Sequence, residues 1–219
     1  MSIFVNENQG VYGLTSAGYA ACIVILAAVL LLASIAAKRS KAKRMGTKQL
    51  VFCAVAIALA MVASMLKIYS FPFGGSVTLC SMLLICLIGY LYGPTTGLLT
   101  GVAYGILQFI VEPYIYFPMQ VIVDYVLAFG ALGLSGFFYK SKNGLVKGYL
   151  LGVAGRYVFA VISGWLFFGE YAWEGWGALP YSLVYNGCYI FAEAALTAVV
   201  LCVPAVAKAF GQVKELALN

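Results

Sequence analysis

The sequence predicts an all-α integral membrane protein whose apolar helices cross the bilayer. Of the 219 residues, 64% are hydrophobic and only 9% are charged, whereas a soluble domain has roughly 25% charged residues. Seven long apolar runs follow one another along the chain, and a helix satisfies all its backbone hydrogen bonds inside lipid. The net charge of +6 is concentrated in the links between these runs, which favours a membrane protein over a nucleic-acid-binding one.

The first expected span is the apolar run at residues 14–37, which is long enough to cross a membrane. Cations follow it directly in the segment 38–48, whereas a signal peptide carries its cations before the apolar run. We therefore expect a retained helix with its N-terminus outside and a basic cytoplasmic linker after it. This divides the chain into an N-terminal unit, 1–48, and a membrane domain, 49–219.

The membrane domain is expected to contain six spans. They are the runs at residues 49–69, 77–92, 95–111, 118–139, 148–168 and 181–210. The link 70–76 (SFPFGGS) contains a proline and two glycines, so it predicts a loop. Gly97, Gly101 and Gly105 share one face of their span, which indicates close helix packing.

The cations test this topology. When the seven spans alternate from an outside N-terminus, eleven of the thirteen Lys and Arg residues fall on one side, in the segments 38–48, 140–147 and 208–214. This is the distribution that the positive-inside rule describes. We therefore expect a multi-pass protein of a prokaryotic plasma membrane, with its N-terminus outside and its C-terminus in the cytoplasm.

Small residues recur on the first helix of the membrane domain. Ala54 and Ala58 lie on one stripe, and Ala56 and Ala60 lie on another. Either stripe would let a second helix approach closely, although alanine is also a good helix former.

Four charged residues are expected at membrane depth: Lys67, Asp124, Arg156 and Glu193. A charge at the bilayer centre costs roughly 2.5–3.5 kcal/mol on insertion scales, so each must face the bundle interior or a cavity. One interpretation pairs Arg156 with Glu193 or Asp124. The alternative is a binding pocket that these groups line.

A stripe with a four-residue period favours the pocket. Arg156, Ala160, Gly164 and Phe168 follow one another on a single helix face, and the two small residues leave volume between a cation and an aromatic ring. Tyr181, Tyr185 and Asn186 open the last span near the same outer surface. Such a pocket suits a small, flat, polar ligand with a cationic part, because aromatic faces and a carboxylate both attract cations.

Several chemistries are excluded by residues that the sequence lacks. Histidine is absent, and the six cysteines lie inside apolar runs without a CxxC pair, so we expect no metal site, no cofactor and no enzymatic activity. The sequence also contains no GxxxxGK[ST] motif. The chain alone therefore cannot use ATP to drive transport, and a pump would need an ion gradient or partner subunits.

Four stretches resemble a known family. They read SFPFGGSV, YGPTTGLLTGVAYGILQ, QVIVDYVLAFGALGLSGFF and RYVFAVISGWLFFGEYAWEGWGALPYSLVYNG. In this order they are similar to the thiamine-specific substrate-binding (S) component of energy-coupling factor (ECF) transporters, from residue 49 to the C-terminus. The resemblance implies a six-helix vitamin-binding bundle, here preceded by one extra transmembrane helix.

The resemblance also implies roles for partners and residues. In that family a transmembrane coupling subunit and two ATPases drive transport, and Ala54 and Ala58 match the stripe that meets the coupling subunit. Phe71 and Phe73 belong to the mobile loop over the site. The positions that match the family's ligand contacts are Asp124, Tyr125, Arg156, Gly164, Phe168, Tyr181 and Asn186.

Three residues depart from the family pattern. Ala160 stands where the family usually has a histidine against the ligand, Asp124 is one methylene shorter than the usual glutamate, and Glu193 adds an acid. A larger or differently substituted ligand would fit the space at Ala160. Two alternatives therefore stay open: an S-component for another vitamin or a thiamine precursor, and a solitary ion-coupled carrier in which Glu193 and Arg156 relay protons or ions.

Overall fold

The computed structural model describes residues 5–8, 11–14, 17, 20 and 45–218. Within this part of the chain, five helices are long and apolar enough to cross a membrane, so the predicted all-α membrane class is confirmed. The expected span at 14–37 and the basic linker lie almost entirely outside the described residues. At the N-terminus, β1 (Val5–Asn8) and β2 (Val11–Leu14) pair as an antiparallel hairpin.

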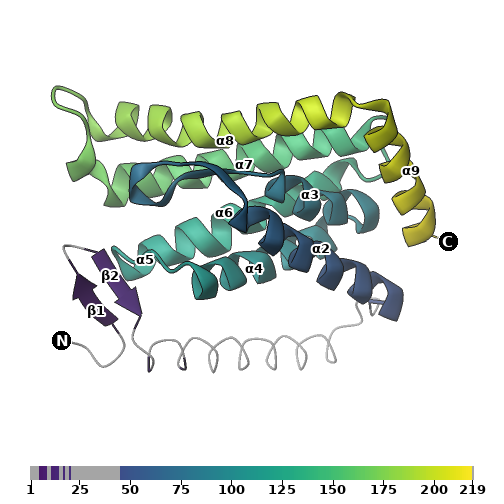
Figure 1. Ribbon diagram of the computed structural model, residues 1–219, viewed down its shortest axis with the longest axis horizontal. Helices are drawn as coiled ribbons and strands as arrows, with labels where there is room; N and C mark the ends of the chain where they lie inside the picture. The colour runs from purple at the N-terminus through teal and green to yellow at the C-terminus, as the bar shows by residue number, and fades with distance from the viewer. Residues whose placement is uncertain (1–4, 9–10, 15–16, 18–19, 21–44, 219) are drawn as a thin grey trace.

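Most helices of the bundle run roughly along the long axis of the molecule, and α2 (Thr47–Met65) lies obliquely to them (Figure 1). The other helices of the bundle are α3 (Ser81–Tyr92), α4 (Pro94–Val111), a segment of changing pitch (Pro118–Phe138), α7 (Gly144–Phe167) and α8 (Ala178–Cys202). The short helix α3 is central, because it packs against α2, α4, α7 and the 118–138 segment. Its side chains Met82, Ile85 and Cys86 are fully buried in the core.

The glycine stripe of α4 is a packing surface, as the sequence predicts. A Cβ atom at Gly97 would lie 2.7 Å from the Cα atom of Gly89 on α3, and one at Gly105 would overlap the carbonyl oxygen of Tyr125. The absence of side chains therefore lets α4 lie directly on the helix that carries Asp124.

We expect Gly105→Ala to destabilise the bundle by about 1–3 kcal/mol, because the added methyl group forces α4 away from the backbone of Tyr125. Thermal unfolding of the detergent-purified protein measures this. Gly187→Ala on α8 is the matched control, since its Cβ atom would find its nearest neighbours at an ordinary 3.6 Å. Equal unfolding temperatures for the two variants would contradict the close contact.

The 118–138 segment changes its helical pitch three times. Helix α5 (Pro118–Val121) continues into a π-helical stretch, Ile122–Leu127, and then α6 (Ala128–Gly130) leads into a 3₁₀ stretch, Ala131–Phe138. A π-helical stretch inserts an extra residue into the turn and rotates the side chains that follow, and such turns are frequent at functional sites. Here it contains Asp124 and Tyr125.

The last expected span, 181–210, is wrong in its bounds. Helix α8 begins earlier, at Ala178, and ends at Cys202, after which α9 (Pro204–Leu218) forms a separate helix across the end of the bundle (Figure 1). Proline at position 204 explains the break, because its ring fits the first turn of a new helix and cannot continue an old one. Lys214 of α9 donates to the Tyr90 hydroxyl at 2.9 Å.

The loop expected at 70–76 is the tip of a β-hairpin. Strand β3 (Lys67–Ser70) pairs antiparallel with β4 (Ser76–Thr78), and a 3₁₀ turn, Pro72–Gly74, joins them. We call residues 67–78 the 67–78 hairpin. Because α2 ends at Met65, Lys67 lies outside the helix, and the prediction that it belongs to a span is wrong.

The two alanine stripes of α2 face opposite ways. Ala56 and Ala60 are buried against the bundle, whereas Ala54 and Ala58 are exposed on its outer face. Within the part of the chain that the structure describes, the second pair is therefore the one exposed to another helix.

Candidate functional site

One cavity of about 360 Å³ lies beneath the 67–78 hairpin. Its walls come from the hairpin, the end of α4, the 118–138 segment, α7 and α8. All eight residues that the sequence predicts at the ligand line it: Asp124, Tyr125, Arg156, Ala160, Gly164, Phe168, Tyr181 and Asn186. Segments far apart in the sequence thus converge on one void, although contact of these residues with a ligand remains a prediction.

Asp124 is the carboxylate of this cavity. One of its oxygens accepts a hydrogen bond from Gln120 Nε2 at 2.7 Å. The Gln120 amide is itself oriented, because its oxygen accepts from the Tyr116 backbone N–H at 3.1 Å. This leaves the second Asp124 oxygen without a protein donor among the described residues, so it can accept from a ligand or offset a ligand's positive charge.

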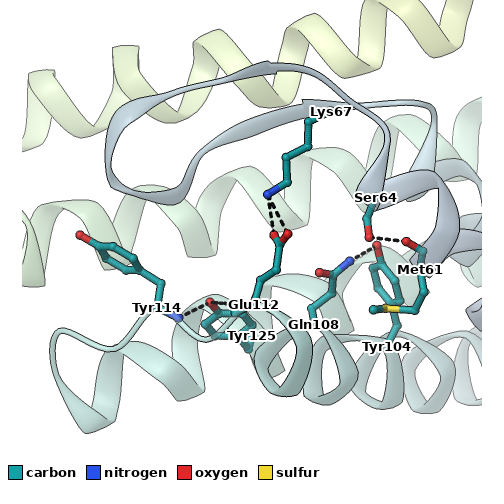
Figure 2. A network of polar contacts seen from close by, with 8 residues as sticks. All are labelled: Met61, Ser64, Lys67, Tyr104, Gln108, Glu112, Tyr114 and Tyr125. Atoms are coloured by element: carbon teal, nitrogen blue, oxygen red, sulfur yellow. Dashed lines mark hydrogen bonds and ion pairs between the residues drawn. The ribbon is translucent and has the colours of Figure 1, made fainter. Parts of the chain in front are cut away.

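Tyr125 supports the site through its hydroxyl. That group donates to the Glu112 carbonyl and accepts from the Tyr114 N–H, both at 2.9 Å (Figure 2). The two bonds close the loop between α4 and α5 over the outer end of the cavity. Because the hydroxyl is used in this way, Tyr125 lines the cavity with its ring, which also packs against Phe109.

Arg156 forms neither of the ion pairs that the sequence left open as an alternative to a pocket. Its guanidinium lies 4.3 Å from the centre of the Phe129 ring, and the ion pair that the described residues do contain joins Lys67 and Glu112. A cation stacked on an aromatic face is stabilised by about 1–2 kcal/mol when it is partly desolvated. Arg156 therefore keeps hydrogen-bond donors for the cavity.

The four-residue stripe of α7 forms one wall. Ala160 is almost fully buried, and Gly164 lets α7 approach α8 closely, since a Cβ atom there would overlap Ser182 Oγ and lie 3.0 Å from Asn186 Nδ2. Next to it, Ser163 Oγ is buried and has no hydrogen-bond partner in the described part of the chain. An unpaired hydroxyl in a cavity wall is a donor that a ligand can use.

Aromatic rings surround the outer end of the cavity. Phe168 stacks on Tyr114 and Tyr116, with ring centres 5.9 and 5.4 Å apart. At the hairpin tip, the ring centre of Phe73 lies 4.3 Å from that of Tyr171. Burial raises the pKa of the Tyr114 hydroxyl, so this group stays neutral at physiological pH. The outer end is therefore apolar and π-rich, which suits a flat cationic ring.

Tyrosines of α8 continue this aromatic surface inward. Tyr181 is buried and packs edge-on against Trp173 of the connector between α7 and α8 (168–177), with ring centres 5.2 Å apart. Tyr181 also stacks on Tyr185, and Tyr185 contacts Tyr189. Asn186 lies on the same helix with its amide among these rings.

The 67–78 hairpin is held over the cavity from two sides. The Tyr185 hydroxyl of α8 bonds the carbonyl oxygen of Pro72 and accepts from the Gly75 N–H at 3.1 Å. On the opposite side, Lys67 Nζ reaches both Glu112 oxygens at 2.8 and 2.7 Å (Figure 2). Of the two predicted loop aromatics, Phe73 lines the cavity, whereas Phe71 packs against Tyr69, Tyr185 and Tyr189 instead.

Glu193 closes the deep end of the cavity and is not paired with Arg156. Its carboxylate accepts from Thr78 Oγ1 at 2.6 Å, from Ser81 Oγ at 3.1 Å and from the backbone N–H groups of Thr78 and Met82. Two of these donors belong to the first turn of α3, where N–H groups lack helical partners. Glu193 thus joins α8 to the base of the hairpin and to α3.

Sequence reasoning missed several residues of this site. Gln120, Ser163, Ser182 and Tyr189 line the cavity and orient or extend its polar groups. A four-residue period from Tyr181 through Tyr185 identifies Tyr189, which could have been found. Nothing local distinguishes Ser163 or Ser182 from helix-packing serines.

A family model described as "Thiamine transporter protein" matches residues 50–210. Among curated proteins, the thiamine transporter ThiT of Bacillus subtilis (strain 168) is 34% identical over 166 residues, which cover 69% of this chain and 85% of that protein. ThiT of Lacticaseibacillus paracasei is 33% identical over 97 residues, which cover 38% of this chain and 48% of that protein.

The fold is also similar to a solved structure. ThiT from Listeria monocytogenes superimposes with a TM-score of 0.60 at 27% sequence identity, covering 72% of this chain and 96% of that chain.

Proposed function

The chain belongs to the thiamine transporter protein family, and from this premise we propose that its cavity binds thiamine for uptake through an ECF-type importer. Thiamine consists of an aminopyrimidine ring and a positively charged thiazolium ring. One cavity brings together two features, and this observation carries the proposal. An Asp124 oxygen lacks a donor among the described residues, and aromatic rings stack at the outer end.

Each group has a role that its chemistry allows. The carboxylate of Asp124 offsets the positive charge of the ligand, and the rings around Phe168 provide faces for the heterocycles. Asn186 is 5% exposed, so a hydrogen bond that it forms with a ligand is largely shielded from solvent and discriminates between ligands. The 67–78 hairpin covers the bound molecule, and its two tethers must release before the ligand enters or leaves.

Titration of the purified protein with thiamine tests the proposal directly. We expect tryptophan fluorescence to change at micromolar ligand or below, because Trp173 contacts the cavity residue Tyr181. Trp165→Phe should keep the response, since Trp165 on α7 does not line the cavity, whereas Trp173→Phe should lose most of it, since Trp173 packs on Tyr181. Absence of any response and of any heat of binding up to millimolar thiamine would refute the proposal.

The partners follow from two features of the chain. The sequence lacks a nucleotide-binding loop, so the energy for inward release comes from elsewhere, here an ECF coupling subunit with two ATPases. Ala54 and Ala58 lie exposed on α2 and offer a helix-sized contact strip for that subunit. A solitary carrier that relays protons or ions between Arg156 and Glu193 is not favoured. Both carboxylate oxygens of Glu193 already accept hydrogen bonds from Thr78, Ser81 and Met82.

Ala160 is consistent with thiamine itself or with a close relative of it. Competition binding with separate pyrimidine and thiazole fragments distinguishes these ligands. We expect intact thiamine to compete far more strongly than either fragment, because both ends of the cavity then contribute.

A further inference from the structure

Both ends of the Asn186 side-chain amide have hydrogen-bond partners in the protein. Its Nδ2 lies 2.9 Å from the Ser182 carbonyl oxygen and 3.1 Å from Ser182 Oγ. Its Oδ1 lies 2.7 Å from the Tyr189 hydroxyl. Asn186 is 5% exposed and lines the cavity, so these contacts are largely shielded from bulk solvent.

Ser182 decides which way this amide points. A hydroxyl has one proton, and Ser182 Oγ donates it to the Val161 carbonyl on α7 at 2.8 Å. Towards Asn186 the hydroxyl can then only accept, and the Ser182 carbonyl can only accept as well. Turning the amide by 180° would place Oδ1 against two acceptors, which is unfavourable at both contacts.

Tyr189 is consistent with this orientation without determining it. Its hydroxyl can donate or accept, so it would tolerate either amide orientation. Its ring is held in place beneath the hairpin, because a Cβ atom at Gly75 would lie 2.8 Å from Tyr189 Cδ1. Tyr189 therefore places a hydroxyl that can donate to the amide oxygen or accept from the amide nitrogen, and Ser182 makes the facing atom the oxygen.

Towards a ligand, Asn186 can still accept a hydrogen bond but has no free donor to offer. Its two N–H donors are directed at Ser182, and the amide oxygen has a second lone pair that Tyr189 does not use. A ligand atom that reaches Asn186 must then be a donor, such as a ring amino group. A ring carbonyl at that position would meet another oxygen and leave both unsatisfied.

We propose that Ser182 is a positioning residue which fixes Asn186 as a hydrogen-bond acceptor, and that the site thereby selects an amino heterocycle over its oxo counterpart. The inference rests on the proposed function for the choice of probe. A purely structural role of Ser182 would weaken the binding of both heterocycles by the same factor, whereas a positioning role changes the ratio between them.

The test compares two ligands with the full-length protein in detergent. One is thiamine, and the other is the analogue in which a carbonyl replaces the pyrimidine amino group. The wild type should prefer thiamine by about tenfold or more. Ser182→Ala should reduce this ratio of Kd values several-fold, because the oxygen of a turned amide then meets one acceptor, the backbone carbonyl of residue 182, instead of two.

Tyr189→Phe is the matched control. It also removes one hydroxyl from the Asn186 amide and lies on the same helix, but both Ser182 acceptors remain. We expect weaker binding of thiamine with no fall in the preference for the amino form. Equal ratios in wild type and Ser182→Ala, or a larger loss of preference in Tyr189→Phe, would overturn the inference.

Failure of the proposed function would look different. In that case the wild type binds neither thiamine nor the analogue. The same comparison is then made by thermal shift with 4-aminopyrimidine and 4-pyrimidinone at millimolar concentration. Stabilisation by the amino fragment alone, diminished in Ser182→Ala, supports the inference, and its absence refutes it.

Discussion

Asp124→Asn is expected to weaken thiamine binding by about 30-fold or more, equivalent to about 2 kcal/mol or more. The substitution keeps the size of the side chain and removes its charge. In the cavity, Asp124 is bonded to Gln120 through one oxygen only, so its charge is available to a cationic ligand. Isothermal titration calorimetry on the purified protein measures the change.

The control for this variant is another acid at the same end of the molecule. Glu170 lies in the connector after α7 and does not line the cavity, so Glu170→Gln should change the affinity by less than about twofold, as expected for a screened surface charge. Unchanged affinity in Asp124→Asn would remove the charge-pairing role from the proposed mechanism.

Glu193→Ala is expected to give the largest loss of stability, about 3 kcal/mol or more. The carboxylate satisfies four donors in a buried position, and each buried donor left without an acceptor costs about 1–3 kcal/mol. For a chain of this size that corresponds to a fall in Tm of roughly 6 °C or more. Differential scanning fluorimetry in detergent is the measurement.

Thr197→Val provides the comparison one turn along the same helix. Thr197 is fully buried, and its hydroxyl has no hydrogen-bond partner in the described part of the chain. Removing that hydroxyl should leave the Tm unchanged or raise it. A Glu193→Ala variant as stable as Thr197→Val would show that Glu193 does not hold the hairpin base and α3 together.

The regular parts of the site could be predicted from the sequence, because helical geometry is periodic. Once residues 148–168 are expected to be helical, Arg156, Ala160, Gly164 and Phe168 must share a face, and the structure places all four on the cavity. The glycine stripe of α4 is predictable for the same reason. The N-terminal span and the division of the chain at residue 48 stay predictions.

The irregular parts could not be predicted, since they depend on partners distant in the chain. Glu193 is bonded to residues more than 100 positions away, so the membrane depth that it was expected to share with Arg156 and Asp124 gave no information about its partners. The π-helical stretch at Asp124 depends on packing against α4, which local propensity does not encode. The break at Pro204 was different, because proline itself signals the start of a new helix.

The two tethers of the 67–78 hairpin differ in their response to the medium. The Lys67–Glu112 pair is solvent-exposed, with side chains 34% and 51% accessible, so it contributes at most about 1 kcal/mol and weakens as ionic strength rises. The Tyr185 contacts are neutral and insensitive to screening. We therefore expect added salt to weaken the attachment of the hairpin at Glu112 and to leave its attachment to α8 through Tyr185 unchanged.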